Sequence, residues 1–394
     1  MLAKEKSRSG AILTKKLLCL FLFLHTVLAS NAVQAVSDER SFQEIASAIN
    51  ADAWVVMDNR SGEVLVEQNK DVRHYPASIT KVATAMMAIN QANLDEVAAV
   101  SQTAAKTEGS SLELKSGDKL TIRDLLYGIM LHSGNDGAVA IAEHLSGSEE
   151  KFAKQMTLFL KTIGAGNTNF VNASGLPDEK HYTTALDMAI ITRYAMKNPV
   201  FREIVKTKAY GWDKGIWTES LENHESVEAE KLALPWTGKP QIINHNQLLA
   251  IYDGAIGIKN GFTHEARYTL VGGAERNGRE LIAVILKSDN VDTAYQDMTR
   301  LLDYAFALPN NTESKAPQAN KLPNVMKPED NKPDTNIEKQ PANMETLEVA
   351  NSNDDSVAIN LPPSSSTGIP FIYLVVGGLF LLAVAYFALA LRRR

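Results

Sequence analysis

The 394-residue chain has almost no cysteine. Its single cysteine is Cys19, which lies in an N-terminal segment that we expect to be removed. The processed protein would then have no thiol, and this excludes a disulfide framework, a thiolate zinc site and a cysteine nucleophile. A zinc-peptidase helix is not supported either, because His224-Glu225 lacks the second histidine of that motif. We therefore expect neither a metal ion nor a cofactor in this protein.

Basic charge of the kind that binds nucleic acid is also scarce. The formal net charge is −6, and no run of Lys and Arg occurs within residues 38–307. A nucleic-acid-binding surface usually shows a basic patch or stripe. We therefore expect no nucleic-acid partner. The length suits one large domain or two ordinary ones, and the 45% of hydrophobic residues are ample for a core.

Aromatic residues are absent from one long stretch, because none occurs between Phe306 and Phe371. Nine of the fourteen prolines fall between residues 309 and 370, among many Asn, Ser, Lys and Glu residues. Such a composition cannot bury a core. We predict that residues 308–367 form a flexible linker, with an r.m.s. span on the order of 40 Å.

Both ends of the chain have the composition of membrane-targeting segments. Residues 1–35 combine a basic start with the apolar run Leu17–Ala29 and small residues before position 36, which is typical of a secretory signal peptide. A retained N-terminal anchor is the alternative. Residues 369–391 are apolar and long enough to cross a bilayer, and the basic tail 392–394 would stay in the cytoplasm. The globular part would then lie outside.

The most informative internal stretch is Tyr75 to Ala88. After Pro76, which suits a helix entrance, the residues are apolar almost all round, so the predicted helix is buried. Ser78 and Lys81 interrupt it and, three residues apart, share one face. Burial disfavours an ammonium, and a neutral lysine beside a hydroxyl is a general base beside a nucleophile.

Two further polar groups of residues interrupt apolar elements. Ser133-Gly134-Asn135 lies between two apolar helical runs, where Gly134 lets a hydroxyl and a carboxamide point the same way; an ordinary helix cap by Ser133 or Asn135 is the alternative. Lys259 lies on a predicted strand, where an edge position would let it line a cleft for a carboxylate-ended ligand. A solvated lysine ahead of a turn is the other interpretation.

The remaining pattern indicates an α/β domain. Two short strands form a predicted hairpin at 53–58 and 63–67, and further strands are expected at 257–263, 268–274 and 281–286. Residues 292–307 are expected to form an amphipathic closing helix.

The three short motifs occur together in one order: Ser78-x-x-Lys81, Ser133-x-Asn135 and Lys259-x-Gly261. This trio resembles the active-site signature of serine penicillin-binding proteins and class A β-lactamases. The stretches Phe170–Pro177, His181–Met188 and Asn244–Leu249 sharpen the resemblance to the low-molecular-mass D-alanyl-D-alanine carboxypeptidases, peptidase S11-like serine enzymes. The likeness covers residues 38–307. It implies a penicillin-binding-protein/class A β-lactamase-like domain, an antiparallel sheet flanked by helices beside an all-helical subdomain.

The resemblance also implies the reaction. Ser78 would be the acylated nucleophile, Lys81 its base and Ser133 a proton relay, in an enzyme that removes the terminal D-Ala from a peptidoglycan stem pentapeptide and is acylated by β-lactam antibiotics. The catalytic domain would lie on the outer side of a bacterial cytoplasmic membrane. The residues expected to bind substrate are Asn135, Lys259, Asn260, Gly261, Phe262 and Thr263.

Departures from the family pattern leave two alternatives open. Asn260 replaces the usual threonine of the third motif, no arginine follows the last strand around 289–294, and Arg267 stands where glycine is usual. A non-catalytic sensor of wall peptide would tolerate these changes. A class A β-lactamase would need a deacylating glutamate, and Glu219–Asn223 has the wrong spacing for it. The stretch 211–240 is longer than usual.

Overall fold

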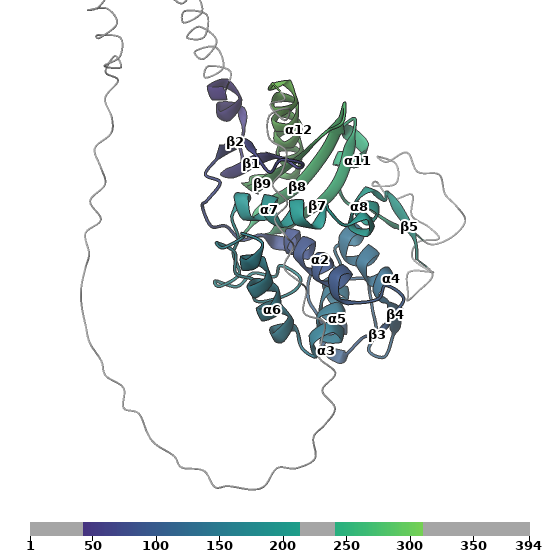
Figure 1. Ribbon diagram of the computed structural model, residues 1–394. Helices are drawn as coiled ribbons and strands as arrows, with labels where there is room; N and C mark the ends of the chain where they lie inside the picture. Colours follow the sequence, from purple (N-terminus) through teal and green to yellow (C-terminus); the bar gives the residue numbers. More distant parts are fainter. Residues whose placement is uncertain (1–41, 213–240, 310–394) are drawn as a thin grey trace, which may run out of the picture. The chain divides into compact units, whose positions relative to one another are not determined.

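A five-stranded antiparallel sheet forms the centre of the computed structural model, which describes residues 42–212 and 241–309 (Figure 1). The strand order is β2-β1-β9-β8-β7, so β2 and β7 are the edges. The predicted hairpin, the three later strands and the edge position of Lys259 are confirmed. The strands are β1 (Ala53–Asp58), β2 (Val64–Gln68), β7 (Ala255–Thr263), β8 (Arg267–Arg276) and β9 (Arg279–Ser288).

The sheet is buried on both faces, and alternate residues of its central strands divide between two hydrophobic cores. Val55 of β1 and Val284 of β9 belong to the larger core, which they share with the helical region. Val56 and Ile285, their chain neighbours, belong to the smaller core, which they share with helix α12 (Val291–Ala307). This explains why β1 and β9 are apolar at almost every position instead of alternating with polar residues.

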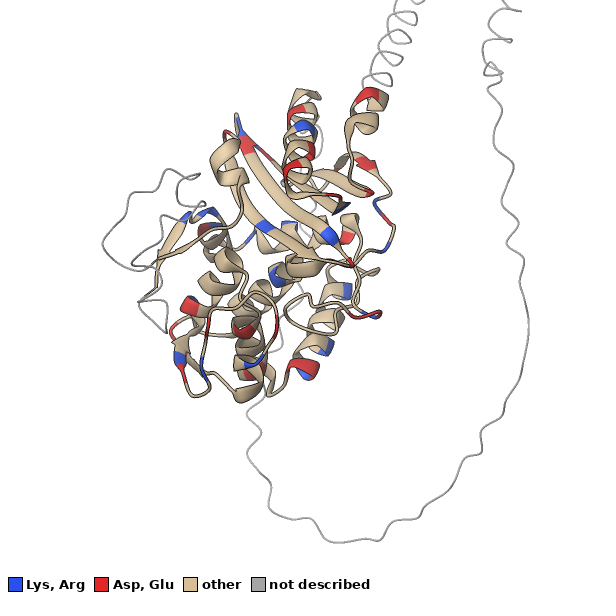
Figure 2. Cartoon of the chain, turned by 180° about the vertical axis from the view of Figure 1, so that it is seen from behind, with Lys and Arg blue, Asp and Glu red and all other residues tan. Residues whose placement is uncertain are grey.

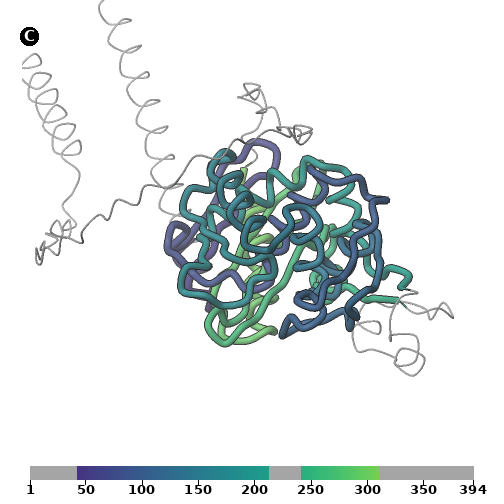
Figure 3. The backbone as a smooth tube through the Cα atoms, turned by 90° about the horizontal axis from the view of Figure 1, so that it is seen from below, coloured from purple at the N-terminus to yellow at the C-terminus, as the bar shows by residue number. Residues whose placement is uncertain are grey.

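Helix α12 covers one face of the sheet, and a helical region covers the opposite face (Figures 1 and 3). Its central helix is α2 (Lys81–Gln91), whose first eight residues are all buried, as its Ala- and Met-rich sequence predicts. The surrounding helices are α3 (Gln102–Ala105), α4 (Ile122–Tyr127), α5 (Asn135–Ser146), α6 (Glu149–Thr162), α7 (Ala185–Ala195) and α8 (Pro199–Lys206). Two short strand pairs, β3 (Val97–Ala99) with β4 (Lys119–Thr121) and β5 (Ala209–Gly211) with β6 (Gln241–Ile243), join them. The short helix α11 (Leu248–Ile251) lies beside β7, and its Leu248 belongs to the smaller core with α12.

The predicted fold class is confirmed for the domain: an antiparallel sheet with helices on both faces. The predicted signal peptide (1–35), the membrane segment (369–391), the basic tail, nearly all of the linker (308–367) and most of the stretch 211–240 lie outside the described residues. Within the described ranges, no helix combines the length and the apolar character needed to cross a bilayer. Figure 2 shows acidic and basic residues interspersed over this part of the chain.

Candidate active site

Ser78 lies at the entrance of α2, but not on the α-helix itself. Residues Ala77–Thr80 form a 3₁₀ turn, and α2 begins at Lys81. The predicted buried helix is therefore present, but its first turn is 3₁₀. The contact survives because a 3₁₀ turn has three residues per turn and aligns positions i and i+3. The Lys81 ammonium donates to the Ser78 hydroxyl over 3.0 Å.

The backbone just before Ser78 is strained and closely surrounded. Ala77 has a φ of 52°, a left-handed conformation that is uncommon for a residue with a side chain. Its carbonyl oxygen lies so close to Gly175 that a Cβ atom there would come within 1.9 Å of it, and Gly175 itself has a φ of 93°. On the sheet side, the Thr269 hydroxyl donates to the Pro76 carbonyl over 2.8 Å. These contacts fix the backbone at Ser78 from both sides.

Lys81 is completely buried and surrounded by oxygen acceptors. Besides Ser78, its ammonium donates to the Asn135 side-chain oxygen and the Ser174 carbonyl, each over 2.7 Å. Burial lowers the pKa of Lys81 well below its ordinary value, and the nearby Lys259 lowers it further, although Asp136 and Glu149 act in the opposite direction. The site thus holds an amine that gives up its proton easily, in contact with a serine hydroxyl.

Ser133 and Asn135 flank the start of α5. A π-helical turn, Gly128–His132, ends at Ser133, whose φ of 70° is left-handed. Gly134 occupies the cap position of α5, and no side chain caps this helix, so the interpretation of Ser133 or Asn135 as an ordinary helix cap is wrong. Asn135 instead bridges Lys81 to the preceding loop, because its side-chain nitrogen donates to the Glu108 carbonyl over 2.7 Å.

Sequence reasoning missed the loop that carries Ser110 into the site. The backbone N–H of Asn135 donates to the Ser110 carbonyl over 2.7 Å. Asp136, which is 1% exposed, accepts hydrogen bonds from the Leu112 amide (2.9 Å) and the Ser111 hydroxyl (2.8 Å) of the same loop. A buried acidic residue directly after a Ser-x-Asn motif was the available signal, because a buried carboxylate must find donors.

The edge strand β7 approaches Ser78 closely through Gly261. A Cβ atom at Gly261 would lie 2.7 Å from the Ser78 backbone nitrogen. Only glycine allows this approach. The glycine of the third motif therefore brings the edge of the sheet against Ser78.

Lys259 and Asn260 of β7 are arranged around one another. Lys259 is 1% exposed, and its ammonium donates to the Asn260 carbonyl (2.9 Å) and side-chain oxygen (3.1 Å). The Asn260 side-chain nitrogen donates to the His245 carbonyl over 3.3 Å. Burial lowers the pKa of Lys259 to about 7, so its cation is only half formed at neutral pH. Lys259 is therefore not the solvated lysine of the alternative interpretation.

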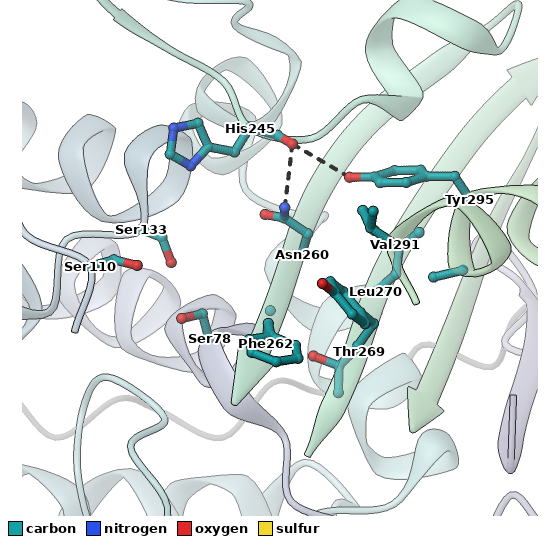
Figure 4. A pocket seen from close by; sticks show the side chains of 13 residues that line it. Ser78, Ser110, Ser133, His245, Asn260, Phe262, Thr269, Leu270, Val291 and Tyr295 are labelled. Carbon is teal, nitrogen blue, oxygen red and sulfur yellow. Dashed lines mark hydrogen bonds between the residues drawn. The ribbon is translucent and has the colours of Figure 1, made fainter. Parts of the chain in front are cut away.

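A pocket of about 220 Å³ brings these elements together (Figure 4). One side is lined by Ser78, Ser110 and Ser133, and the other by Asn260 and Phe262 of β7. Gly261, which lies between these two strand residues in the chain, also lines the pocket. Lys81 and Lys259 are buried next to this lining: Lys81 donates to Ser78 and to Asn135, and Lys259 donates to Asn260.

Thr263 and Arg267, at the two ends of the β7–β8 turn, make contacts outside the pocket. The Thr263 hydroxyl accepts a hydrogen bond from the Ala266 amide over 3.0 Å, inside the β7–β8 turn. The Arg267 guanidinium donates to the Asp289 carbonyl over 3.2 Å, and neither Thr263 nor Arg267 lines the pocket. Phe262, by contrast, is 44% exposed at the pocket and packs against Tyr268, with ring centroids 4.6 Å apart.

His181 is a packing residue next to the turn that carries Ser78. It is fully buried, stacks on Phe170 and contacts the Thr80 hydroxyl over 2.9 Å. Its Nδ1 accepts from the Val171 amide over 3.1 Å, and burial lowers its pKa to about 3, so the ring is neutral.

Comparison with known proteins agrees with this geometry. Residues 39–290 match the family model described as D-alanyl-D-alanine carboxypeptidase, peptidase S11. The Bacillus subtilis D-alanyl-D-alanine carboxypeptidase DacF is 31% identical over 291 residues, which cover 73% of this chain and 70% of that protein. The D-alanyl-D-alanine carboxypeptidase of Streptomyces sp. strain K15 is 35% identical over 264 residues, covering 64% and 86%.

Solved structures show the same similarity. The D-alanyl-D-alanine carboxypeptidase of Mycobacterium tuberculosis superposes with a TM-score of 0.59 at 31% identity, over 67% of this chain and 93% of that chain. The Streptomyces K15 DD-transpeptidase superposes with a TM-score of 0.58 at 31% identity, over 66% and 98%. With the paired serine and lysine, the second serine and the edge-strand lysine gathered at one pocket, the chain belongs to the D-alanyl-D-alanine carboxypeptidase family.

Proposed function

We propose that Ser78 is the nucleophile with which this protein removes the terminal D-Ala from peptidoglycan stem pentapeptides. One observation carries the proposal: the Ser78 hydroxyl lies 3.0 Å from the ammonium nitrogen of a completely buried lysine. Burial keeps the pKa of Lys81 low, so the amine can accept the hydroxyl proton as a general base.

The reaction proceeds in two steps. Ser78 Oγ attacks the carbonyl carbon of the penultimate D-Ala while its proton passes to Lys81. The peptide bond then breaks, and the nitrogen of the leaving D-Ala receives a proton through the Ser133 hydroxyl, which lines the same pocket. Water attacks the acyl-enzyme ester, which releases the shortened peptide as a carboxylate and returns a proton to Ser78.

The oxyanion of each tetrahedral intermediate is stabilised by the backbone N–H groups of Ser78 and Phe262. The close approach of Gly261 to the Ser78 nitrogen supports this assignment, because it brings the strand that carries Phe262 beside the nucleophile. Fixed N–H donors of this kind typically contribute about 10²–10³ in rate.

The terminal carboxylate binds at Lys259 and Asn260. The buried ammonium supplies the charge, and the Asn260 side chain retains one N–H beyond the one it donates to His245. A β-lactam carries a carboxylate and an acylating carbonyl, so it acylates Ser78 at the same place and is released slowly.

The ends of the chain support a membrane topology in this proposal. The sequence of residues 1–35 favours export, and residues 369–391 followed by three arginines favour a single span with a cytoplasmic C-terminus. The catalytic domain, residues 38–307, would then lie at the outer face of a bacterial cytoplasmic membrane, joined to its anchor by the linker 308–367.

The test is the release of D-alanine from a synthetic stem pentapeptide by the purified full-length protein. Wild-type protein should release one D-alanine per peptide, and Ser78→Ala should release none. The matched control is Ser148→Ala, because Ser148 begins the second Ser-x-x-Lys of the chain and only caps α6. Absence of release by the wild type would favour the sensor, and sustained fast turnover of nitrocefin would favour a β-lactamase.

A further inference from the structure

The active-site pocket continues past Asn260, across the edge strand, to a wall that belongs to β8 and α12. Figure 4 shows Ser78 and Ser133 on one side of Asn260, and Leu270, Val291 and Tyr295 on the other. Leu270, Ala294 and Tyr295 are buried, with exposed fractions of 1%, 3% and 4%. The far wall is therefore a packed apolar surface at the end of the catalytic pocket.

The polar groups at this end are already paired with protein atoms. The Tyr295 hydroxyl accepts from the Gln247 amide over 3.0 Å and donates to the His245 carbonyl over 3.5 Å. The same carbonyl accepts from Asn260. Burial lowers the pKa of His245 to about 3, so its ring carries no charge at neutral pH.

Charge is missing from the same surface. None of the described residues that line the pocket is Asp, Glu, Lys or Arg. A ligand that reaches beyond Asn260 therefore finds a surface suited to hydrocarbon.

We propose that this wall receives the side chain of the last residue of the substrate, and that the protein prefers stem peptides ending in a D-amino acid with an aliphatic side chain larger than methyl over those ending in D-Ala. This rests on the proposed function, which places the scissile carbonyl at Ser78 and the terminal carboxylate at Asn260. The last side chain then lies next to Leu270, Val291 and Ala294. The volume of about 220 Å³ is below the roughly 300–1,000 Å³ of a whole-ligand pocket, so it accommodates part of a ligand.

The expected effect is a preference that can be measured. Burial of one methylene group is worth about fourfold in affinity, and D-Leu has three more carbon atoms than D-Ala. Because some of this surface stays exposed in the cleft, we expect kcat/KM for a peptide ending in D-Ala-D-Leu to exceed that for D-Ala-D-Ala by about fivefold or more. The assay quantifies the free D-amino acid released by the full-length protein from diacetyl-L-Lys-D-Ala-D-Xaa peptides.

Two substitutions on α12 locate the effect. Val291→Phe places a ring at the pocket wall and should lower the D-Leu to D-Ala ratio of kcat/KM about tenfold. Gln296→Phe introduces the same ring on the same helix at an exposed position outside the pocket, and it should leave the ratio unchanged.

The outcomes separate this inference from the proposed function. If the wild type releases D-Ala but the D-Leu peptide is the poorer substrate, the inference is wrong and the proposed function stands. The inference is equally wrong if Val291→Phe folds, as shown by penicillin labelling, and keeps the wild-type ratio. If neither peptide is hydrolysed and no penicillin adduct forms at Ser78, the proposed function itself fails.

Discussion

The partial protonation of Lys259 predicts that ligand binding depends on pH, and this dependence can be measured separately from acylation. Ligand binding is measured with the Ser78→Ala variant, which cannot form an acyl-enzyme. Because burial lowers the pKa of Lys259 to about 7, half of the Lys259 side chains are protonated at pH 7. Only the protonated form attracts the carboxylate of the ligand. The protonated fraction falls to about one in a hundred at pH 9, since each pH unit is a factor of ten.

The dissociation constant of a D-Ala-D-Ala peptide should therefore rise by up to about 50-fold between pH 7 and pH 9. The carboxylate of the peptide stays ionised throughout this range, so only the protein titrates. Isothermal titration calorimetry at three or four pH values measures the constant directly. The sign is fixed: binding is strongest below pH 7 and weakens as the pH rises.

Two controls make the result specific to Lys259. A peptide with a C-terminal amide lacks the carboxylate and should bind with the same affinity at both pH values. Lys259→Arg keeps its charge over the whole range and should abolish the pH dependence. A free-acid peptide whose affinity changes less than twofold between pH 7 and pH 9, or an amide that follows the same curve, would refute the reasoning.

Three further predictions concern the residues around Ser78. Lys81→Met should slow acylation by penicillin about 10²–10⁴-fold, measured as adduct against time by mass spectrometry, whereas Lys151→Met on the exposed surface of α6 should not; equal rates would remove Lys81 as the base. Asp136→Ala should lower the free energy of unfolding by about 3–5 kcal/mol in urea titrations, because the amide of Leu112 and the hydroxyl of Ser111 lose a buried acceptor; a loss below 1 kcal/mol contradicts this role. Gly175→Ala should cost more than about 2 kcal/mol and slow acylation, because its Cβ would meet the Ala77 carbonyl, whereas Gly166→Ala, with no atom within 4 Å of the added Cβ, should change neither.

Local pattern was enough to predict the sheet and the serine–lysine contact. The strands have clear turn signals between them, and α12 has a clear apolar face, so these elements could be recognised from the sequence. The spacing of Ser78 and Lys81 predicted their contact even though the turn is 3₁₀, because both helix types place i and i+3 on one face.

The parts that could not be predicted depend on contacts between distant segments. The left-handed conformation of Ser133 follows from a π-helical turn that no periodicity announces. Ser110 enters the pocket because Asn135 and Asp136, some 25 residues away, bond its loop. The Ser110 contact depends on tertiary packing that residue spacing does not encode. The contact of the Thr263 hydroxyl with the Ala266 amide, by contrast, is local to the β7–β8 turn.

The most direct test of the central assignment is the position of the covalent adduct formed with benzylpenicillin. The full-length protein is incubated with the antibiotic, digested, and its peptides are sequenced by mass spectrometry. A single adduct on Ser78, absent from the Ser78→Ala variant, is the predicted result. An adduct on any other residue, or one that persists in Ser78→Ala, would contradict the account.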